Sequence, residues 1–292
     1  MMEHFFVITN GSKDKEYKSA KKIKNYMEQR GCSCSIATDY GQDDTKEYST
    51  DIKEIPENTQ CAIVLGGDGT MLQAANDLAT TQLPILGVNL GNLGFLADIE
   101  ENHLIPAMNK LISNQFVLEE RMLLEGSYLE VDGNEKKQLA LNDIVINKGH
   151  CYHLVSMKVY INGKPLDFYI ADGVVISSPT GSTGYNLSAG GPVMLPTMEG
   201  IIITPICPHS LNNRSIVVSA KDEIVVEIGS IRGEKKDEGI LIMDGMVQRT
   251  MYTGESITIR KAEENTRFIK LNGANFLEIF HSKLGMGKDT KL

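Results

Sequence analysis

The chain has 292 residues, 41% hydrophobic and 23% charged, a composition typical of globular proteins that excludes disordered and fibrous classes. Its formal net charge of -9 disfavours nucleic acid and anionic membranes as partners, because no general positive field attracts phosphate. Five scattered cysteines without a CxxC pair, no signal peptide and no apolar run of about 18 residues predict a cytoplasmic protein with reduced thiols.

The first third of the chain alternates strand-like and helix-like segments. Short apolar runs predict strands at 4–10, 34–38, 61–65 and 84–89. Apolar residues three and four apart predict helices at 16–30, at 71–79 and around 105–112, whereas 39–60 is polar and loop-like. Such alternation predicts a parallel sheet with helices on its faces, in which ligands bind at the carboxyl ends of the strands.

The pattern changes near residue 115, where strand-like runs are joined by tight turns. These turns are Asp132-Gly133, Asn162-Gly163 and Asp244-Gly245, and such pairs favour β-hairpins. Residues 215–228 predict two further strands, and 267–284 predicts a strand followed by a helix. We therefore expect an α/β domain with a parallel sheet at 1–114, against which 267–292 packs. A mostly antiparallel β domain that binds nucleotide is expected at 115–266, so the protein is α+β overall.

Three glycines surround one aspartate directly after the strand at 61–65, in the sequence GGDGT (66–70). Glycines let the backbone turn sharply and approach a ligand, and the start of the following helix suits a phosphate. No Gly-Lys-Ser/Thr follows, so this is not a Walker loop. Asp68 could bind a metal ion or act as a base for an attacking hydroxyl, or it could simply cap the helix. These five residues leave both interpretations open.

The segment LALNDIVIN (139–147) contains two polar residues in an apolar run. If it is one continuous strand, Asn142 and Asp143 point to opposite sides, and at least one of them enters a poorly solvated place. The pair could face a polar ligand, or it could lie at a bulge or strand end where both side chains reach water.

Small and hydroxyl-bearing residues dominate 170–193, directly after the strand-like VVIS. Hydroxyl groups, the Tyr185 ring and close-packing glycines would suit a nucleoside pocket, although the composition alone would also suit a linker. His150 and His153 lack a third metal ligand nearby, and His209 forms no triad that spacing can identify. The basic stretch 13–24 is expected to be a solvated helix face, and 91–98 is either a glycine-rich joint or a loop lining the cleft of GGDGT.

Taken together, these stretches resemble the NAD kinase family. The resemblance rests on GGDGT (66–70), NLGNLGFL (89–96), Asn142-Asp143, Asp172-Gly173, SPTGSTGYNLSAGGP (178–192), PHSL (208–211) and Asp244-Gly245. The GGDG element is shared with diacylglycerol kinases and phosphofructokinases, whereas the long hydroxyl–glycine motif after Asn-Asp is specific. Three positions depart from the family pattern: Gly184 replaces a usual alanine, Ser215 a frequent proline and Met246 a common glutamine.

The resemblance implies phosphorylation of the 2′-hydroxyl of the adenosine ribose of NAD, with ATP or polyphosphate as donor and a divalent ion, Mg²⁺, as cofactor. It implies Asp68 as the catalytic base and a homodimer or homotetramer, and it does not identify metal ligands. The nucleotide-binding residues that it implies are Gly66, Gly67, Gly69, Thr70, Leu72, Asn89, Phe95, Asn142, Asp143, His153, Asp172, Thr180, Thr183, Gly184, Tyr185, Asn186, Leu187 and Ser188. The alternatives are a lipid or sugar kinase that shares GGDG, or a non-catalytic NADP(H)-binding sensor.

Overall fold

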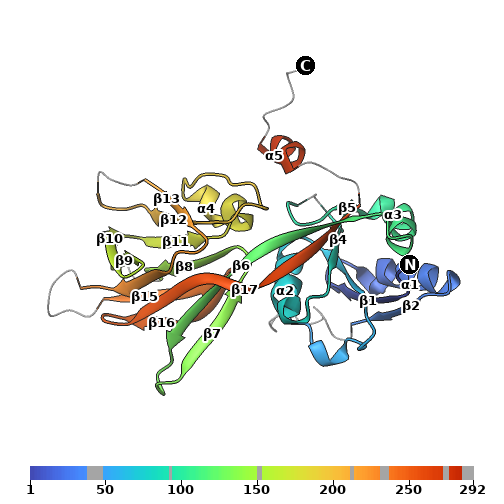
Figure 1. The fold of residues 1–292 in the computed structure, drawn as a ribbon, viewed down its shortest axis with the longest axis horizontal. Helices are drawn as coiled ribbons and strands as arrows, with labels where there is room; N and C mark the ends of the chain where they lie inside the picture. Colours follow the sequence, from blue (N-terminus) through green and yellow to red (C-terminus); the bar gives the residue numbers. More distant parts are fainter. Residues whose placement is uncertain are drawn as a thin grey trace. The chain divides into compact units, whose positions relative to one another are not determined.

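The chain divides into two compact units in the computed structural model (Figure 1). The described residues are 1–37, 49–91, 94–149, 153–210, 214–230, 237–271 and 276–284. Unit 1 comprises Met1–Glu120 and Thr266–Leu292, and unit 2 comprises Arg121–Asn265. The chain passes between the units inside two long strands, β6 (Val117–Leu129) and β17 (Ser256–Lys270).

Unit 1 is built around a parallel sheet. Its strands are β1 (His4–Thr9), β2 (Ser33–Ile36), β3 (Cys61–Gly66), β4 (Ile85–Asn89) and β5 (Ile99–Glu100). The strand order is β4-β3-β1-β2, with β5 and the end of β17 also paired to β4. Its helices are α1 (Lys18–Gln29), α2 (Asp68–Leu78), α3 (Leu104–Ile112) and α5 (Phe276–Leu284), with 3-10 turns at Lys15–Tyr17, Ile52–Glu54, Ala79–Thr81 and Glu101–His103. The predicted parallel α/β fold is confirmed.

Helices cover both faces of the unit 1 sheet. On one face, the apolar residues of α1 and α3 join Phe5, Val7 and Ile63 in one buried cluster. On the other face, a Cβ atom at Gly87 of β4 would lie 3.1 Å from the sulfur of Met71 in α2. Burial on both faces explains why β3 is apolar along its whole length and does not alternate with polar residues.

Helix α1 shows how the sequence pattern produces an element. Ala20, Ile23 and Met27 are fully buried at helical spacing, as the pattern over 16–30 predicts. The α-helix nevertheless begins only at Lys18, because Glu16 and Tyr17 have positive φ and form a 3-10 turn before it.

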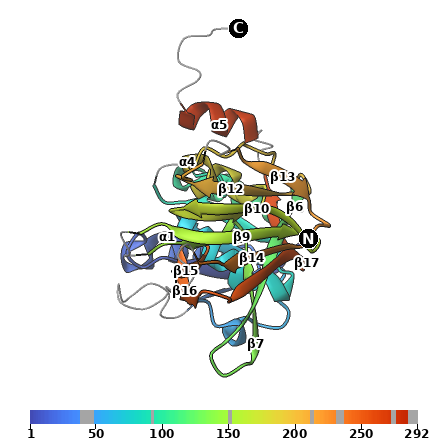
Figure 2. The same cartoon turned by 90° about the vertical axis from the view of Figure 1, so that its left-hand side faces the viewer.

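Unit 2 consists of two antiparallel sheets with a shared core. One contains β10 (Lys164–Ala171), β9 (Val155–Ile161), β14 (Ile224–Ile228) and β17 in that order, together with β6 and β7 (Glu135–Ala140). The other has the order β13 (Ile216–Ser219), β12 (Gly200–Ile206), β11 (Gly173–Ser177), β8 (Asp143–Asn147), β15 (Glu238–Met243) and β16 (Met246–Tyr252). Figure 2 views this unit face on, with β10, β9 and β14 side by side.

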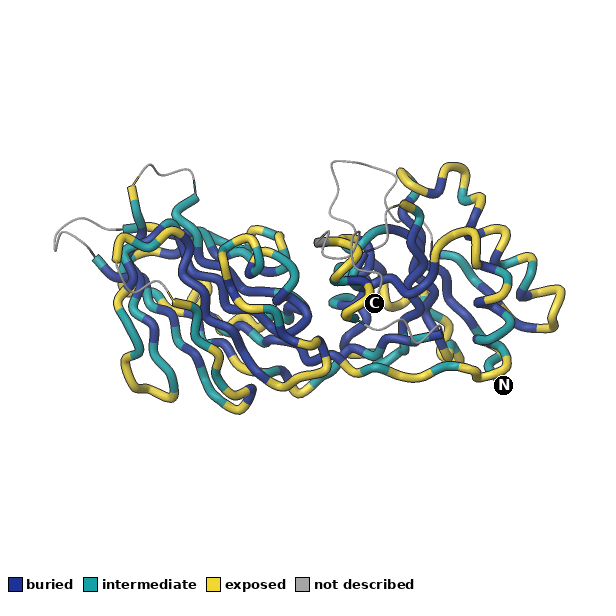
Figure 3. Tube along the Cα trace, turned by 90° about the horizontal axis from the view of Figure 1, so that it is seen from above, coloured by how far each residue is buried: buried dark blue, intermediate teal, exposed yellow. Residues whose placement is uncertain are grey.

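The core of unit 2 explains why buried residues alternate with less buried ones along β14 and β15, whereas β11 and β12 are buried along their whole length. Inward residues such as Met157, Ile176 and Val226 form one buried cluster between the sheets, and exposed residues gather at the turns (Figure 3). The two strands predicted at 215–228 are β13 and β14, and they belong to different sheets. The predicted antiparallel β domain is confirmed.

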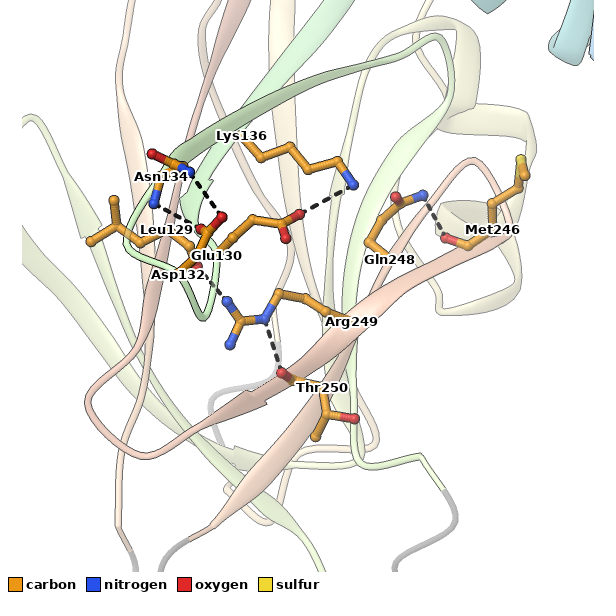
Figure 4. A network of polar contacts seen from close by, with 9 residues as sticks. All are labelled: Leu129, Glu130, Asp132, Asn134, Lys136, Met246, Gln248, Arg249 and Thr250. Carbon is orange, nitrogen blue, oxygen red and sulfur yellow. Dashed lines mark hydrogen bonds and ion pairs between the residues drawn. The ribbon is translucent and has the colours of Figure 1, made fainter.

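Three hairpins end at the turn pairs that the sequence indicated. Asn162-Gly163 and Asp244-Gly245 are two-residue turns with positive φ at both positions, the conformation that Asn-Gly and Asp-Gly favour. At the third turn, both Asp132 carboxylate oxygens accept hydrogen bonds from Asn134 at 3.0 and 2.8 Å (Figure 4). Arg249 of β16 donates to the carbonyl of Leu129 at the end of β6, and this bond links the hairpin to a strand of the other sheet.

Within the described residues, no helix is long and apolar enough to cross a membrane.

Candidate functional site

The GGDGT turn joins β3 to α2 in unit 1. Strand β3 ends at Gly66, Gly67 occupies the N-cap position, and α2 begins at Asp68. A Cβ atom at Gly66 would overlap the Thr70 hydroxyl, so glycine is required for this close turn. No side chain caps the helix, and the first-turn amides of α2 therefore stay available to an anion at the carboxyl end of the sheet.

The Asp68 carboxylate faces the segment after β4. One oxygen accepts a hydrogen bond from the Phe95 amide at 2.9 Å, and the other accepts from the Leu96 amide at 3.2 Å. A Cβ atom at Gly94 would occupy the space of this carboxylate. The interpretation of Asp68 as the cap of its own helix is therefore wrong, since the N-cap residue is Gly67 and the carboxylate is held by another loop.

Two further predicted residues lie near this turn. Asn89, at the end of β4, is buried and forms a tight turn by accepting from the Gly91 amide at 3.1 Å. The half-buried Phe95 ring packs on α5, with the Phe276 centroid at 6.0 Å and the Lys283 ammonium at 5.2 Å. The predicted loop 91–98 thus packs against the GGDGT turn, although Asn92 and Leu93 lie outside the described residues. Leu72 is half-buried in α2.

Lys13 also belongs to this region, which the sequence did not indicate. Its Nζ atom lies 2.7 Å from the position that a Cβ atom at Gly67 would take. Lys13 precedes α1 and the 3-10 turn, so it is not part of the solvated helix face predicted for 13–24. Only the sheet order, which places the end of β1 beside the end of β3, brings it to the glycines.

In unit 2, Asn142 and Asp143 lie at a break between two strands. β7 ends at Ala140 and β8 begins at Asp143, so the single strand predicted over 139–147 is wrong. The break also removes the expected alternation. Asn142 Nδ2 and Asp143 Oδ2 are each 3.7 Å from the Cβ position of Gly184, and both polar groups therefore converge on one point.

The carboxylate of Asp244 holds this break in place. It accepts hydrogen bonds from the amides of Leu141, Asn142 and Asp143 at 2.7, 2.8 and 3.0 Å. Asp143 is only 6% exposed, as expected for a polar residue in an apolar run. Burial raises the pKa of the Asp143 carboxyl to about 7, and the nearby charge of Asp244 adds to the rise. The sequence indicates Asp244 as a turn residue and as part of the family motif Asp244-Gly245, but not as the carboxylate that holds this break.

The hydroxyl–glycine segment is a folded structure and not a linker. Ser178 donates through its hydroxyl to the Leu141 carbonyl, and its amide donates to the Asn142 carbonyl at 2.9 Å. After β11 the chain forms a 3-10 turn, Thr180–Thr183, and the short helix α4, Tyr185–Ser188. At Gly181 a Cβ atom would overlap the Asn142 carbonyl. This segment and the Asn142-Asp143 break are therefore packed into one unit.

The predicted residues in this segment differ in accessibility. Tyr185 is 40% exposed, which leaves its ring open to a ligand, and Thr183, Gly184 and Leu187 are half-buried whereas Ser188 is exposed. Asn186 is fully buried, and its side chain bonds Ser182, Pro192 and Thr204. Asn186 therefore holds the segment together. Thr180 is buried and accepts from Arg121 at 3.3 Å.

The remaining candidates in unit 2 are less enclosed. Asp172 forms an ion pair with Lys148 at 2.7 Å. His153 is exposed, and His150 lies outside the described residues. Met246 is one of the three positions that depart from the family pattern. Its main-chain carbonyl accepts a hydrogen bond from the side-chain amide of Gln248 at 3.1 Å (Figure 4). The binding roles of all these residues stay predictions.

A divalent ion would find few protein ligands here. Among the residues that the structure describes, no group of three or more His, Cys, Asp or Glu could hold a metal ion. The scarcity of protein ligands fits an Mg²⁺ ion that is bound mainly by substrate phosphates and water, as is common in phosphoryl transfer. It does not fit a site in which protein side chains alone coordinate a resident ion.

Both halves of the chain match known protein families. The model of the ATP-NAD kinase N-terminal domain matches residues 5–116, and that of the C-terminal domain matches 141–271. An NAD kinase from Lachnoclostridium phytofermentans is 40% identical over 287 residues, which cover 97% of this chain and 99% of the relative. An NAD kinase from Lachnospira eligens is 37% identical over 294 residues, which cover 97% of this chain and 100% of the relative.

Solved structures agree with these matches. Yeast NADH kinase complexed with NADH has a TM-score of 0.84 and 25% identity, over 100% of this chain and 90% of that chain. An NAD kinase from Archaeoglobus fulgidus in complex with ATP has a TM-score of 0.74 and 24% identity, and the match covers 97% of this chain and 100% of that chain. At this identity the match supports the fold alone. The fold and the matched domains define a two-domain nucleotide kinase. The chain belongs to the ATP-NAD kinase family, and the resemblance seen in the motifs is confirmed.

Proposed function

We propose that this chain is an NAD kinase, which transfers the γ-phosphoryl group of ATP to the 2′-hydroxyl of the adenosine ribose of NAD. The observation that carries the proposal is the Asp68 carboxylate, held by two backbone amides beside an uncapped helix start in a chain matched by both family domains. The relatives named NAD kinase support it. A lipid or sugar kinase and a non-catalytic sensor find no comparable support.

In this reaction Asp68 accepts the proton of the 2′-hydroxyl as its oxygen attacks the γ-phosphorus. The free amides at the start of α2 bind phosphate oxygens. Asn142 and Asp143, which converge on Gly184, hydrogen-bond the ribose hydroxyls or base edges of NAD. The exposed Tyr185 ring stacks on a base.

ATP is the donor that the family description supports, and polyphosphate is a further donor to be compared with it. Mg²⁺ bound to the phosphates of the donor would neutralise part of their charge, and the described residues offer no ligand cluster of their own for it. A cytoplasmic location and assembly as a homodimer or homotetramer stay expectations from the family resemblance.

The proposal is tested by incubating the protein with NAD, MgATP or polyphosphate and measuring NADP by an NADP-specific coupled assay. We expect NADP and ADP from NAD and ATP, and no phosphorylated product from diacylglycerol or fructose phosphate. Absence of NADP with every donor and divalent ion would refute the proposal.

The Asp68→Asn variant tests the catalytic base. It keeps the size of the side chain and one acceptor for the loop amides but cannot take the proton. We expect kcat to fall about 10²–10⁴-fold with little change in NAD affinity. Glu57→Gln, at an exposed carboxylate of the same unit, is the matched control and should keep full activity. Equal rates for Asp68→Asn and the wild type would remove Asp68 from the mechanism.

A further inference from the structure

Lys13 lies in a turn that is anchored on both sides. Before it, the Asn10 carbonyl accepts from the Lys13 amide at 2.9 Å, and the Asn10 side chain accepts from Ser12 at 2.6 and 3.0 Å. After it, the buried Asp14 carboxylate accepts from the amides of Ser19 and Ala20 at 2.8 and 3.0 Å. The backbone of Lys13 is therefore held in place beside the end of the sheet.

The same turn is attached to the glycine loop. The Asn10 amide donates to the Leu65 carbonyl at 3.1 Å, and the Asn10 side chain donates to the Thr70 hydroxyl at 3.5 Å. The Lys13 side chain extends over Gly67, whose missing side chain leaves space for the ammonium group. A side chain at position 67 would collide with it, so the glycine and the lysine occupy complementary space.

The ammonium group of Lys13 is not neutralised by the protein. Within the described part of the chain, no carboxylate forms an ion pair with it. Two carboxylates of this region form hydrogen bonds elsewhere, Asp14 with the start of α1 and Asp68 with the amides of Phe95 and Leu96. An unpaired cation beside free helix amides is an arrangement that binds phosphate.

On the basis of the proposed function, we propose that Lys13 binds the phosphate chain of the phosphoryl donor. Lys13 lies over Gly67, and Gly67 directly precedes Asp68, where the acceptor hydroxyl reacts. The donor phosphates must lie beside that hydroxyl for in-line transfer. In a protein with a net charge of -9, this lysine supplies local positive charge that the composition as a whole does not.

The step in which Lys13 takes part is the transfer itself. The 2′-oxygen of the ribose forms a bond to the γ-phosphorus and gives its proton to Asp68. The bond from the γ-phosphorus to the bridging oxygen breaks, and its electron pair stays on the β-phosphate of ADP. Lys13 neutralises the negative charge that develops on these phosphate oxygens and keeps its own proton.

The experiment compares Lys13→Met, Lys13→Arg and Lys15→Met in the full-length protein. Lys15 is an exposed lysine two residues away and serves as the matched control. Initial rates are measured against MgATP at saturating NAD, and against NAD at saturating MgATP. We expect Lys13→Met to lower kcat/KM for ATP about 10²-fold, with KM for NAD changed less than about threefold. Lys13→Arg should restore most of the loss, and Lys15→Met should match the wild type.

A binding measurement separates this inference from a structural effect. MgADP binding is measured by calorimetry for the three variants and the wild type, and their thermal unfolding midpoints are compared. We expect weaker MgADP binding only for Lys13→Met, with unchanged midpoints. The inference is overturned if Lys13→Met behaves like Lys15→Met, or if it weakens NAD and ATP equally. Failure of the wild type to form NADP would instead refute the proposed function.

Discussion

Asp143 shows how the surroundings of one residue set its chemistry. It lies at the first position of β8, almost fully buried, with the charged Asp244 carboxylate bonded to its own amide. Desolvation is the larger cause of its raised pKa and the charge of Asp244 the smaller one, and together they bring the pKa to about 7. The group therefore changes charge near neutral pH.

This pKa predicts that NAD binding depends on pH. Above about pH 7 Asp143 is a carboxylate that can accept hydrogen bonds from ribose hydroxyls, and below it the group is neutral. We expect KM for NAD to rise about five- to tenfold between pH 7.5 and pH 6. Steady-state kinetics across pH 6–8.5 measure the effect. Asp143→Asn cannot titrate and should show a flat profile, whereas the same slope in that variant would assign the titration to another group.

At the level of elements, the loop after β4 is joined to the start of α2 by hydrogen bonds to Asp68. The Phe95 and Leu96 amides orient the Asp68 carboxylate, and Gly94 leaves space for it. A catalytic carboxylate positioned by backbone amides of a second loop is sensitive to small displacements. In the proposed mechanism the loop would therefore contribute to catalysis by positioning Asp68, without providing a reacting group.

Gly94→Ala tests this coupling. The added Cβ atom would overlap the Asp68 carboxylate and displace it, so we expect kcat to fall about 10²-fold or more. Gly91→Ala is the matched control, because no atom lies within 4 Å of its Cβ position, and it should keep its activity. Both variants are compared by NADP formation and by thermal unfolding. If Gly94→Ala were as active as Gly91→Ala, the loop would not position Asp68.

At the level of the molecule, the last part of the chain completes the first unit. Residues Ile269 and Leu271 enter the buried cluster that α1 and α3 form. The buried Asp98 carboxylate accepts from the Leu271 amide at 2.8 Å, and its second oxygen is 3.7 Å from the Lys270 ammonium, within reach of an ion pair but not of a hydrogen bond. Segments more than 170 residues apart thus share one core.

Removal of this buried carboxylate should destabilise the protein. Asp98→Ala removes the acceptor of the buried Leu271 amide and a negative charge close to the poorly exposed Lys270 ammonium, so we expect the free energy of unfolding to fall by about 1–3 kcal/mol. Arg267→Ala, which breaks an exposed pair with Glu120 in the same unit, should cost about 0–1 kcal/mol. Denaturant unfolding of both variants measures the difference. Similar values for the two variants would show that the Asp98 contacts contribute little.

Local patterns in the sequence predicted most of the elements. Helix α1 follows from the spacing of Ala20, Ile23 and Met27, and the hairpin at Asn162-Gly163 follows from residues that accept positive φ. Hydrophobic spacing and turn chemistry act over a few residues, so a single sequence contains this information. The motif resemblance, carried by GGDGT and the hydroxyl–glycine segment, likewise needed no structure to identify the family.

The detailed geometry of the site depends on contacts between distant residues. Asp68 bonds amides 27 and 28 positions away, Asp244 holds a strand break 101 to 103 positions away, and Lys13 reaches Gly67 because β1 and β3 are neighbours. The sequence predicted one strand through Asn142 and Asp143 because local alternation continues across 139–147. The chain breaks there because the Asp244 carboxylate binds three successive amides, and that interaction exists only after the sheets have assembled.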